Sequence, residues 1–337
     1  MERRGVTANG VGKVSDEKNS AAVFLDVPCT SPPKARYHKG EQQHTLREHR
    51  KGSRMDTLLK SKERDVRISP EGPIVIIGEK INPTGRKLLA AAYRDGNLDY
   101  VKELAQKQVA AGADLLDINV GVPGMDEVEL LPKVVGAVAS IVDVPLCLDS
   151  ANVRALAAAL PLAPGKPLVN SVNGTEASLS SVLPLIKERG AAVIGLTMDE
   201  RGIPSDPEVR MSIAGKILER AGKLGIGAED VIIDPLVLTV GADTNAGVVT
   251  LQTIERVRKE FGININLGAS NVSFGLPERR TINEAFLALA AGMGASCVIT
   301  DPMQHTLMIR AIDLLLGRDA FGARYIRHYR TLPKDSC

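Results

Sequence analysis

The sequence predicts an α/β protein whose main body, residues 71–320, is a closed (β/α)8 barrel. From residue 73 onward, eight short apolar runs alternate with segments that have helical periodicity. Runs of this length that are rich in Val, Ile and Leu are typical of parallel strands covered on both faces. Eight strand–helix units within about 250 residues match the usual size of such a barrel.

The expected strands are the apolar runs themselves. They are "IVIIGEK" (74–80), "ADLLDINVG" (113–121), "VPLCLDS" (144–150), "KPLVNSV" (166–172), "AAVIGLTMD" (191–199), "VIIDPLV" (231–237), "NINLGASNV" (264–272) and "ASCVITDPM" (295–303). A doubly wound open sheet is the alternative, but it usually has fewer units and often a Gly-rich fingerprint. The segment after the first run, "GEKINPTGRK", matches neither the dinucleotide nor the nucleoside triphosphate fingerprint.

The segments between the runs carry helix signals. One apolar face with i, i+3, i+4, i+7 spacing is formed by Leu179, Val182, Leu183 and Ile186. In "SDPEVR", Asp206 is expected to cap a helix that has Pro207 at its first position. A last helix is expected over about 304–316.

Residues 1–70 differ from the rest in composition. They hold 15 Lys/Arg and 9 Asp/Glu, whereas residues 71–337 hold 27 and 31. This segment is polar and lacks sustained periodicity, so we predict that it is disordered. It is either a basic arm for an acidic partner or a plain unstructured extension, with Met55 as a plausible start of translation. Residues 321–337 are predicted to be a C-terminal tail.

The composition argues against several classes of function. Aromatic residues make up 3% of the chain and Trp is absent, which disfavours readers of nucleic acid that stack bases. A net charge of +2 gives no general attraction to nucleic acid, and no run approaches the roughly 18 apolar residues of a membrane span. The buried setting expected for Cys147 and Cys297 suits free thiols in a reducing compartment, so we expect a cytoplasmic protein.

Metal and triad chemistry are not expected either. The four Cys form no C-x-x-C pair, and three of the five His lie within residues 1–70. Asp117 has no second carboxylate or His at a fixed ligand spacing. His305 is expected to be a surface or capping residue at the start of the last helix.

Polar residues recur where the apolar runs end. In a (β/α)8 barrel the carboxyl ends of the strands surround the reaction pocket, so these side chains should converge. The candidates are Glu79, Asn82, Asp117, Asn119, Asp149, Asn170, Asp234 and Asn271. Carboxylates accept paired N–H donors, and amides both donate and accept. This mixture suits a flat heterocycle with a 2-amino-4-oxo edge, such as a pterin.

Individual candidates have plainer explanations that stay open. Asp149 could act near the N-cap of a helix that begins near Ala151. Asp117 could bond loop backbone, and Asn271 could be a turn residue. The repetition of polar residues at one strand end after another is the stronger signal.

Several motifs together resemble a known family. They are "IIGEKINPTGR", "LLDINVG", "PLCLDS", "LVNSVNG", "IGLTMDERGIP", "IIDPLV" and "GASNVSFGLPERRTIN", in order over about residues 73–318. They look like the methyltetrahydrofolate:corrinoid methyltransferases and the folate domain of cobalamin-dependent methionine synthase, which share a dihydropteroate synthase-like barrel.

The resemblance implies a set of pterin contacts. It assigns them to Asp149, Asn170, Asp234 and Asn271, and it relates Glu79, Asn82, Asp117 and Asn119 to other polar residues of that pocket. The implied reaction moves a methyl group between N5 of tetrahydrofolate and the cobalt of a corrinoid, with Asn271 hydrogen-bonded near N5 as the catalytic candidate. The sequence has no D-x-H-x-x-G motif, so a partner protein is expected to supply the cobalamin. A homodimer is expected by analogy, and no bound metal is expected.

Two other functions remain as alternatives. A dihydropteroate synthase would share the barrel and the pterin pocket, but its pyrophosphate needs basic loops. The seventh loop here, "SNVSFG", has no Lys or Arg, although Arg279 and Arg280 follow it. A pterin-binding subunit without its own catalysis would use the same residues.

Overall fold

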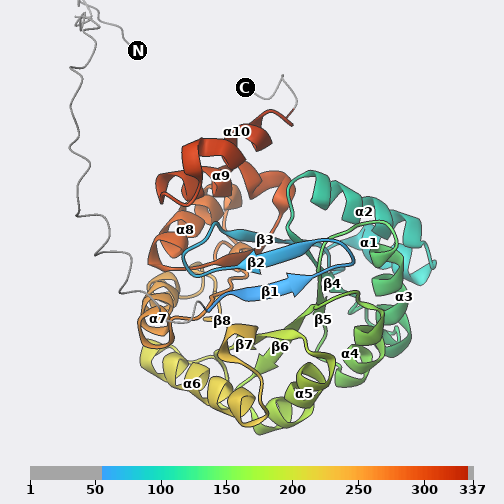
Figure 1. Cartoon of the computed structure of the whole chain (residues 1–337), viewed down its shortest axis with the longest axis horizontal. Helices are drawn as coiled ribbons and strands as arrows, with labels where there is room; N and C mark the ends of the chain where they lie inside the picture. The colour runs from blue at the N-terminus through green and yellow to red at the C-terminus, as the bar shows by residue number, and fades with distance from the viewer. Residues whose placement is uncertain (1–54, 333–337) are drawn as a thin grey trace, which may run out of the picture. The chain divides into compact units, whose positions relative to one another are not determined.

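Seven parallel strands form one curved sheet in the computed structural model, which describes residues 55–332. They are β3 (Val75–Ile81), β4 (Leu115–Asn119), β5 (Leu146–Asp149), β6 (Leu168–Asn173), β7 (Ala192–Leu196), β8 (Val231–Asp234) and β9 (Cys297–Thr300). Their order, β8-β7-β6-β5-β4-β3-β9, follows the chain around a ring whose two ends are β8 and β9 (Figure 1).

The segment 264–268 closes this ring between β8 and β9. The backbone N–H of Asn266 donates to Ile233 O at 2.9 Å, and Ile299 N–H donates to Leu267 O at 2.8 Å. Isolated parallel bridges join the segment to both neighbouring strands. The predicted (β/α)8 barrel is therefore confirmed, and its seventh strand is irregular, joined to its neighbours by isolated bridges.

Helices cover the outside of the sheet, as the alternating pattern predicts (Figure 1). They are α1 (Lys87–Arg94), α2 (Leu98–Ala110), α3 (Glu127–Ala139), α4 (Val153–Ala159), α5 (Glu176–Arg189), α6 (Pro207–Lys223), α7 (Ala246–Phe261), α8 (Arg279–Met293) and α9 (Pro302–Leu315). The Asp206 side chain accepts from Glu208 N–H at 2.8 Å and Pro207 opens α6, as predicted. The last predicted helix is present and begins two residues earlier, at Pro302.

A hairpin closes the N-terminal end of the barrel. Its strands are β1 (Thr57–Lys60) and β2 (Asp65–Ile68), which pair antiparallel. Leu59 and Ile68 are fully buried among residues at the starts of the barrel strands, such as Leu115 and Leu168. The prediction of disorder over 1–70 is thus wrong for residues 55–70, and its remainder, 1–54, lies outside the described residues.

One amide clips the hairpin to the barrel. The Asn264 Nδ2 group donates to Met55 O at 2.9 Å, to Thr57 Oγ1 at 3.0 Å and to Ile68 O at 2.9 Å. Asn264 belongs to the segment that closes the ring, so these hydrogen bonds join the closing segment to the β1–β2 hairpin.

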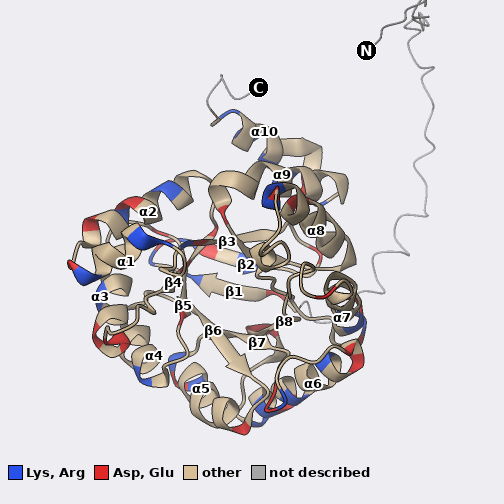
Figure 2. Cartoon of the chain, turned by 180° about the vertical axis from the view of Figure 1, so that it is seen from behind, with Lys and Arg blue, Asp and Glu red and all other residues tan. Residues whose placement is uncertain are grey.

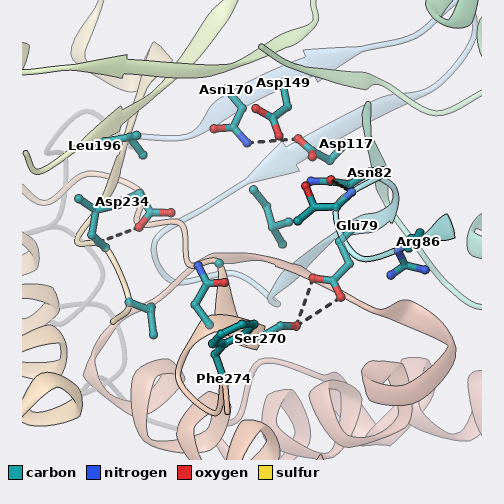
Figure 3. A pocket seen from close by; sticks show the side chains of 16 residues that line it. Glu79, Asn82, Arg86, Asp117, Asp149, Asn170, Leu196, Asp234, Ser270 and Phe274 are labelled. Carbon is teal, nitrogen blue, oxygen red and sulfur yellow. Dashed lines mark hydrogen bonds between the residues drawn. The ribbon is translucent and has the colours of Figure 1, made fainter. Parts of the chain in front are cut away.

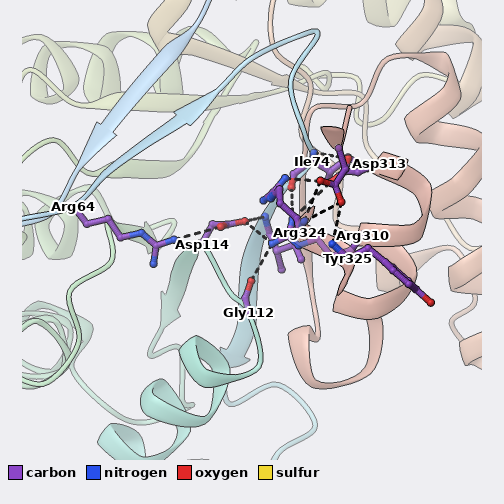
Figure 4. A network of polar contacts seen from close by, with 10 residues as sticks. Arg64, Ile74, Gly112, Asp114, Arg310, Asp313, Arg324 and Tyr325 are labelled. Carbon is purple, nitrogen blue, oxygen red and sulfur yellow. Dashed lines mark hydrogen bonds and ion pairs between the residues drawn. The ribbon is translucent and has the colours of Figure 1, made fainter. Parts of the chain in front are cut away.

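The chain ends in a short helix where a tail was predicted. After the 3-10 turn η4 (Ala320–Gly322), α10 (Ala323–Tyr329) packs on α9. An ion-pair network fastens both helices to the start of β3 (Figure 4): Asp313 accepts from Ile74 N–H at 2.8 Å and from Arg324 Nη1 at 3.3 Å. The predicted tail is wrong for 323–329, and residues 333–337 lie outside the described part.

Two further points concern the described residues only. Cys147 and Cys297 are buried free thiols, as predicted. Between residues 55 and 332, no helix has the length and apolar character needed to cross a membrane.

Candidate active site

A cavity of about 390 Å³ opens at the carboxyl ends of the strands, within the 300–1,000 Å³ that is usual for small-molecule sites (Figure 3). Seven of the eight predicted site residues line it: Glu79, Asn82, Asp117, Asp149, Asn170, Asp234 and Asn271. The eighth, Asn119, does not line the cavity and donates from Nδ2 to Asp149 Oδ2 at 3.0 Å. Seven of these side chains thus converge on one space, while the roles of all eight stay predictions.

Two carboxyls in one wall of the cavity, Asp117 and Asp149, each accept a hydrogen bond from an amide. Asp117 and Asn119 are two residues apart on β4, so their side chains point to the same side of the strand. Strand register sets Asn119 opposite Asp149 on β5, and Asp149 opposite Asn170 on β6. Asn170 Nδ2 donates to Asp117 Oδ1 at 3.3 Å. Each of these two carboxyls therefore accepts a hydrogen bond from one amide, and the Cys147 thiol is a second partner of Asp117.

Burial raises the pKa of the carboxyls in this wall. It raises the pKa of Asp117 well above the ordinary range, and the neighbouring charge of Asp149 adds to the effect. The pKa of Asp149 rises to about 6, chiefly through burial, although the hydrogen bond from Asn119 opposes the change. Carboxyls held this way favour ligands that donate hydrogen bonds to them.

Asp234, at the end of β8, faces the cavity from another side. Its side chain is 6% exposed, and it accepts from Leu236 N–H at 2.8 Å and from Asn266 Nδ2 at 2.7 Å. Burial raises its pKa to about 6 against those two hydrogen bonds and the charge of Arg210. This carboxyl is therefore positioned by the two donors and remains costly to ionise.

The loop after Asp234 is held in an uncommon conformation. Leu236 has a φ of 61°, which is rare for a residue with a branched side chain. The buried guanidinium of Arg210, 1% exposed, donates from Nη1 to Pro235 O at 2.6 Å and to Leu236 O at 2.8 Å. Arg210 reaches over from α6 and fixes the backbone that supplies one of the donors to Asp234.

Glu79, on β3, and Asn271, which follows the closing segment 264–268, also line the cavity. Ser270 Oγ lies 3.2 Å from Glu79 Oε2, and burial raises the pKa of Glu79 despite this contact. Asn271 ends the 3-10 turn η3 (Ala269–Asn271), with its backbone N–H bonded to Gly268 O. Its side-chain amide has no hydrogen bond to any residue between 55 and 332, so both its donor and acceptor are available to a ligand.

Some of the plainer interpretations are resolved by these contacts. Asn152, not Asp149, caps α4, through hydrogen bonds from Arg154 N–H and Ala155 N–H. Asn82 partly serves its own loop, because its Oδ1 accepts from Thr84 N–H at 3.0 Å. His305 is 2% exposed, so its expected place on the surface is wrong.

Sequence reasoning missed Asn266 and Arg86. Asn266 is fully buried and orients Asp234; its only signal is the alternation of two Asn with apolar residues in "NINL". Arg86 stands inside the quoted "INPTGR" motif and lines the cavity. Of the residues lining this space, it is the only Lys or Arg. In the described ranges no group of three or more His, Cys, Asp or Glu is arranged to hold a metal.

Comparison with known proteins places these features in context. The family model described as "Pterin binding enzyme" matches residues 78–301. The chain is 31% identical over 265 residues to methylcorrinoid:tetrahydrofolate methyltransferase of Eubacterium limosum, covering 76% of this chain and 96% of that protein. It is 30% identical over 273 residues to methionine synthase of Mycobacterium tuberculosis, covering 74% of this chain and 23% of that one.

Similar solved structures agree with the architecture. Dihydropteroate synthase from Yersinia pestis superposes with a TM-score of 0.61 at 18% identity, over 79% of this chain and all of that one. The enzyme from Vibrio fischeri gives 0.59 at 19% identity, over 78% of this chain and 99% of that one. At these identities the likeness shows the shared barrel.

Proposed function

The chain belongs to the pterin-binding enzymes and, among them, to the methyltransferases; from that membership we infer that it moves a methyl group between N5 of tetrahydrofolate and the cobalt of a corrinoid held by another protein. The observation that carries the proposal is the cavity, in which carboxyls and amides from successive strands converge. A pterin presents N–H groups and an exocyclic NH₂ on one edge, which carboxylates accept in parallel.

The protein's part in the reaction is to position the ring and to stabilise the leaving nitrogen. The partner's corrinoid supplies the cobalt that takes or gives the methyl group. When the methyl leaves N5, the electron pair of the broken C–N bond stays on nitrogen, which must be protonated or strongly hydrogen-bonded. The unengaged amide of Asn271 is the group proposed to bond near N5, while Asp149, Asn170 and Asp234 hold the ring. The rate gain then comes from positioning and fixed dipoles.

Dihydropteroate synthesis is the less favoured alternative. Its pyrophosphate would need several cations, and the lining of this cavity offers Arg86 alone. Arg279 is engaged elsewhere, since it donates to Ser270 O at 2.7 Å and to Ser273 Oγ at 3.0 Å.

The proposal is tested by single-turnover methyl transfer from methyltetrahydrofolate to free cobalt(I) cobalamin, followed by absorbance. The wild-type chain should show turnover, which a non-catalytic subunit would not. Asn271→Ala should lower the rate constant by about 10²–10³-fold, as loss of one preorganised donor does, while folate affinity falls less.

Asn152→Ala is the matched control for that variant. Asn152 caps α4 away from the cavity lining, so its loss should cost about 1 kcal/mol of stability and leave the rate constant unchanged. Equal losses of rate and affinity in Asn271→Ala would reduce Asn271 to an ordinary binding residue. Formation of dihydropteroate by the wild-type chain would replace the proposal with the synthase.

A further inference from the structure

We propose that Arg86 is an anion-binding residue for the carboxylate-bearing tail of the folate, so that the site selects glutamylated folates over bare pterins. This inference rests on the proposed function and extends it to the far end of the substrate. Arg86 ends the loop between β3 and α1, is half-buried, and lines the cavity. Its contacts differ from those of the other arginines near the site.

The guanidinium of Arg86 has no hydrogen bond and no ion pair with any residue that the structure describes. By contrast, Arg210 donates hydrogen bonds to the backbone carbonyl of Pro235, and Arg279 donates to Ser270 O and Ser273 Oγ. Both arginines therefore hold loops. Glu79 feels the positive charge of Arg86, which lowers its pKa slightly against burial, but Glu79 is bonded to Ser270 instead. A planar fork of free donors is suited to a carboxylate or phosphate.

The loop holds Arg86 in place without using its side chain. Asn82 Oδ1 accepts from Thr84 N–H at 3.0 Å, and Arg86 N–H donates to Pro83 O at 2.9 Å. Gly85 has a φ of 71°, a conformation that glycine adopts without strain, and this makes the turn before Arg86 possible. Two short turns thus fix the backbone from which the Arg86 side chain extends into the cavity lining.

The single cation of the lining lies at one side of the cavity. Figure 3 shows Arg86 across the cavity from Asp234 and on the same side as Glu79, a carboxyl whose pKa is raised by burial. Phe274, which is 68% exposed, lines the same space and offers an aromatic face between polar groups. A complementary ligand donates hydrogen bonds at one end, is aromatic along its length, and is anionic at the other. Folates have this order: pterin, aminobenzoyl ring, glutamate carboxylates.

The test compares ligands with and without the tail by calorimetry. Tetrahydrofolate and 6-methyltetrahydropterin are titrated into the wild-type chain, Arg86→Gln and Lys87→Gln. Lys87 is the neighbouring exposed cation and does not line the cavity, so it controls for net charge. Arg86→Gln should weaken tetrahydrofolate by about tenfold, the size expected for hydrogen bonds to a charged group that is partly solvated, and leave the tailless pterin unchanged. Lys87→Gln should weaken neither.

Each other outcome overturns the inference in a distinct way. Equal losses for both ligands would make Arg86 a pterin or structural residue, and no loss for either would remove it from binding. Inorganic pyrophosphate is the further arm: if Arg86→Gln weakens pyrophosphate and spares tetrahydrofolate, Arg86 serves a phosphate. If the wild-type chain binds tetrahydrofolate and the pterin equally well, only the tail site fails. If it binds neither, the proposed function itself fails.

Discussion

Two clusters of buried carboxyls lie at opposite ends of the barrel and differ in their partners. At the start of β3, Asp313 and Asp114 are ion-paired with Arg310, at 3.7 and 3.4 Å, and Arg324 adds a second cation to Asp313 (Figure 4). Around the cavity, Asp117, Asp149 and Asp234 have amide and backbone donors instead (Figure 3).

Surface charge follows neither pattern. Figure 2 shows Lys and Arg interspersed with Asp and Glu along the outer helices, where exposed pairs contribute little. The two clusters therefore differ in role: one contributes to stability and the other is available for binding. Burial raises the pKa of Asp313 too, but three arginines and Ile74 N–H oppose that change without a ligand, so this network serves the fold. The cavity carboxyls are buried without an ion pair, and a ligand that donates hydrogen bonds would lower the cost of their burial.

The largest effect is expected when the ion-pair network at the start of β3 is broken. Asp313→Ala leaves Arg310 and Arg324 without their shared partner and removes the acceptor for Ile74 N–H. Losing one member of a buried pair costs about 3–5 kcal/mol, which should appear in urea unfolding. Asp99→Ala removes an exposed pair with Lys102 and should cost about 0–1 kcal/mol. A loss for Asp313→Ala as small as that of the control would show that the network is not what fastens α9.

The second effect is the pH dependence of the cavity carboxyls. The pKa of Asp149 is about 6 in the folded chain, against about 3.9 when unfolded. Between these values the folded state holds the extra proton, so the free energy of unfolding falls as pH rises from about 4 to 6. Above pH 6 the cost is complete, at about 3 kcal/mol for this carboxyl.

Asp149→Asn should abolish that component. The stability of the variant relative to wild type should rise by about 3 kcal/mol between pH 4 and pH 7, whatever constant offset the new amide introduces. Asp143→Asn is the control of opposite sign, because the hydrogen bond from Ser61 Oγ lowers the pKa of Asp143. A relative stability of Asp149→Asn that stays flat with pH would mean that the carboxyl is solvated and unstrained.

The parts of the fold that have a continuous apolar run in the sequence were predictable. Each of the eight barrel positions overlaps a predicted strand, and only β3 and β6 extend one residue beyond it, because each run is rich in branched aliphatic residues. The hairpin was missed because polar and charged residues interrupt its buried positions Leu59, Val66 and Ile68, so no apolar run marks its strands. Its order comes from contact with the barrel end and from Asn264, which no local pattern reveals. The helix α10 likewise depends on a distant partner, Asp313.

The site was predictable where residues end strands and less so elsewhere. Carboxyl ends of parallel strands converge by topology, so position in a run was enough to gather Asp117, Asp149 and Asp234. Arg86 required the turn at Gly85 to be known, because the same residue one position along would face solvent as Lys87 does. Asn266 required the register of the irregular closing segment.

The smallest expected effect separates binding from folding at one carboxyl. Asp234→Ala removes the acceptor proposed for the pterin edge, and hydrogen bonds to a charged group are worth about 1.5–3 kcal/mol. Folate affinity measured by calorimetry should fall by about ten- to a hundredfold. The fold should change little, because the lost hydrogen bonds from Leu236 N–H and Asn266 Nδ2 are offset by removal of a buried charge.

Asp230→Ala is the reciprocal control for Asp234→Ala, four residues upstream at the other end of β8. Asp230 pairs with Lys166 at 2.6 Å, half-buried and outside the cavity lining, so its loss should lower the thermal midpoint and spare folate affinity. The two variants should therefore move opposite observables, affinity for Asp234 and stability for Asp230. If Asp234→Ala instead lowers the midpoint and keeps its affinity, the carboxyl is a structural residue like Asp313. That result would contradict the proposed difference between the carboxyls of the cavity and those of the network at the start of β3.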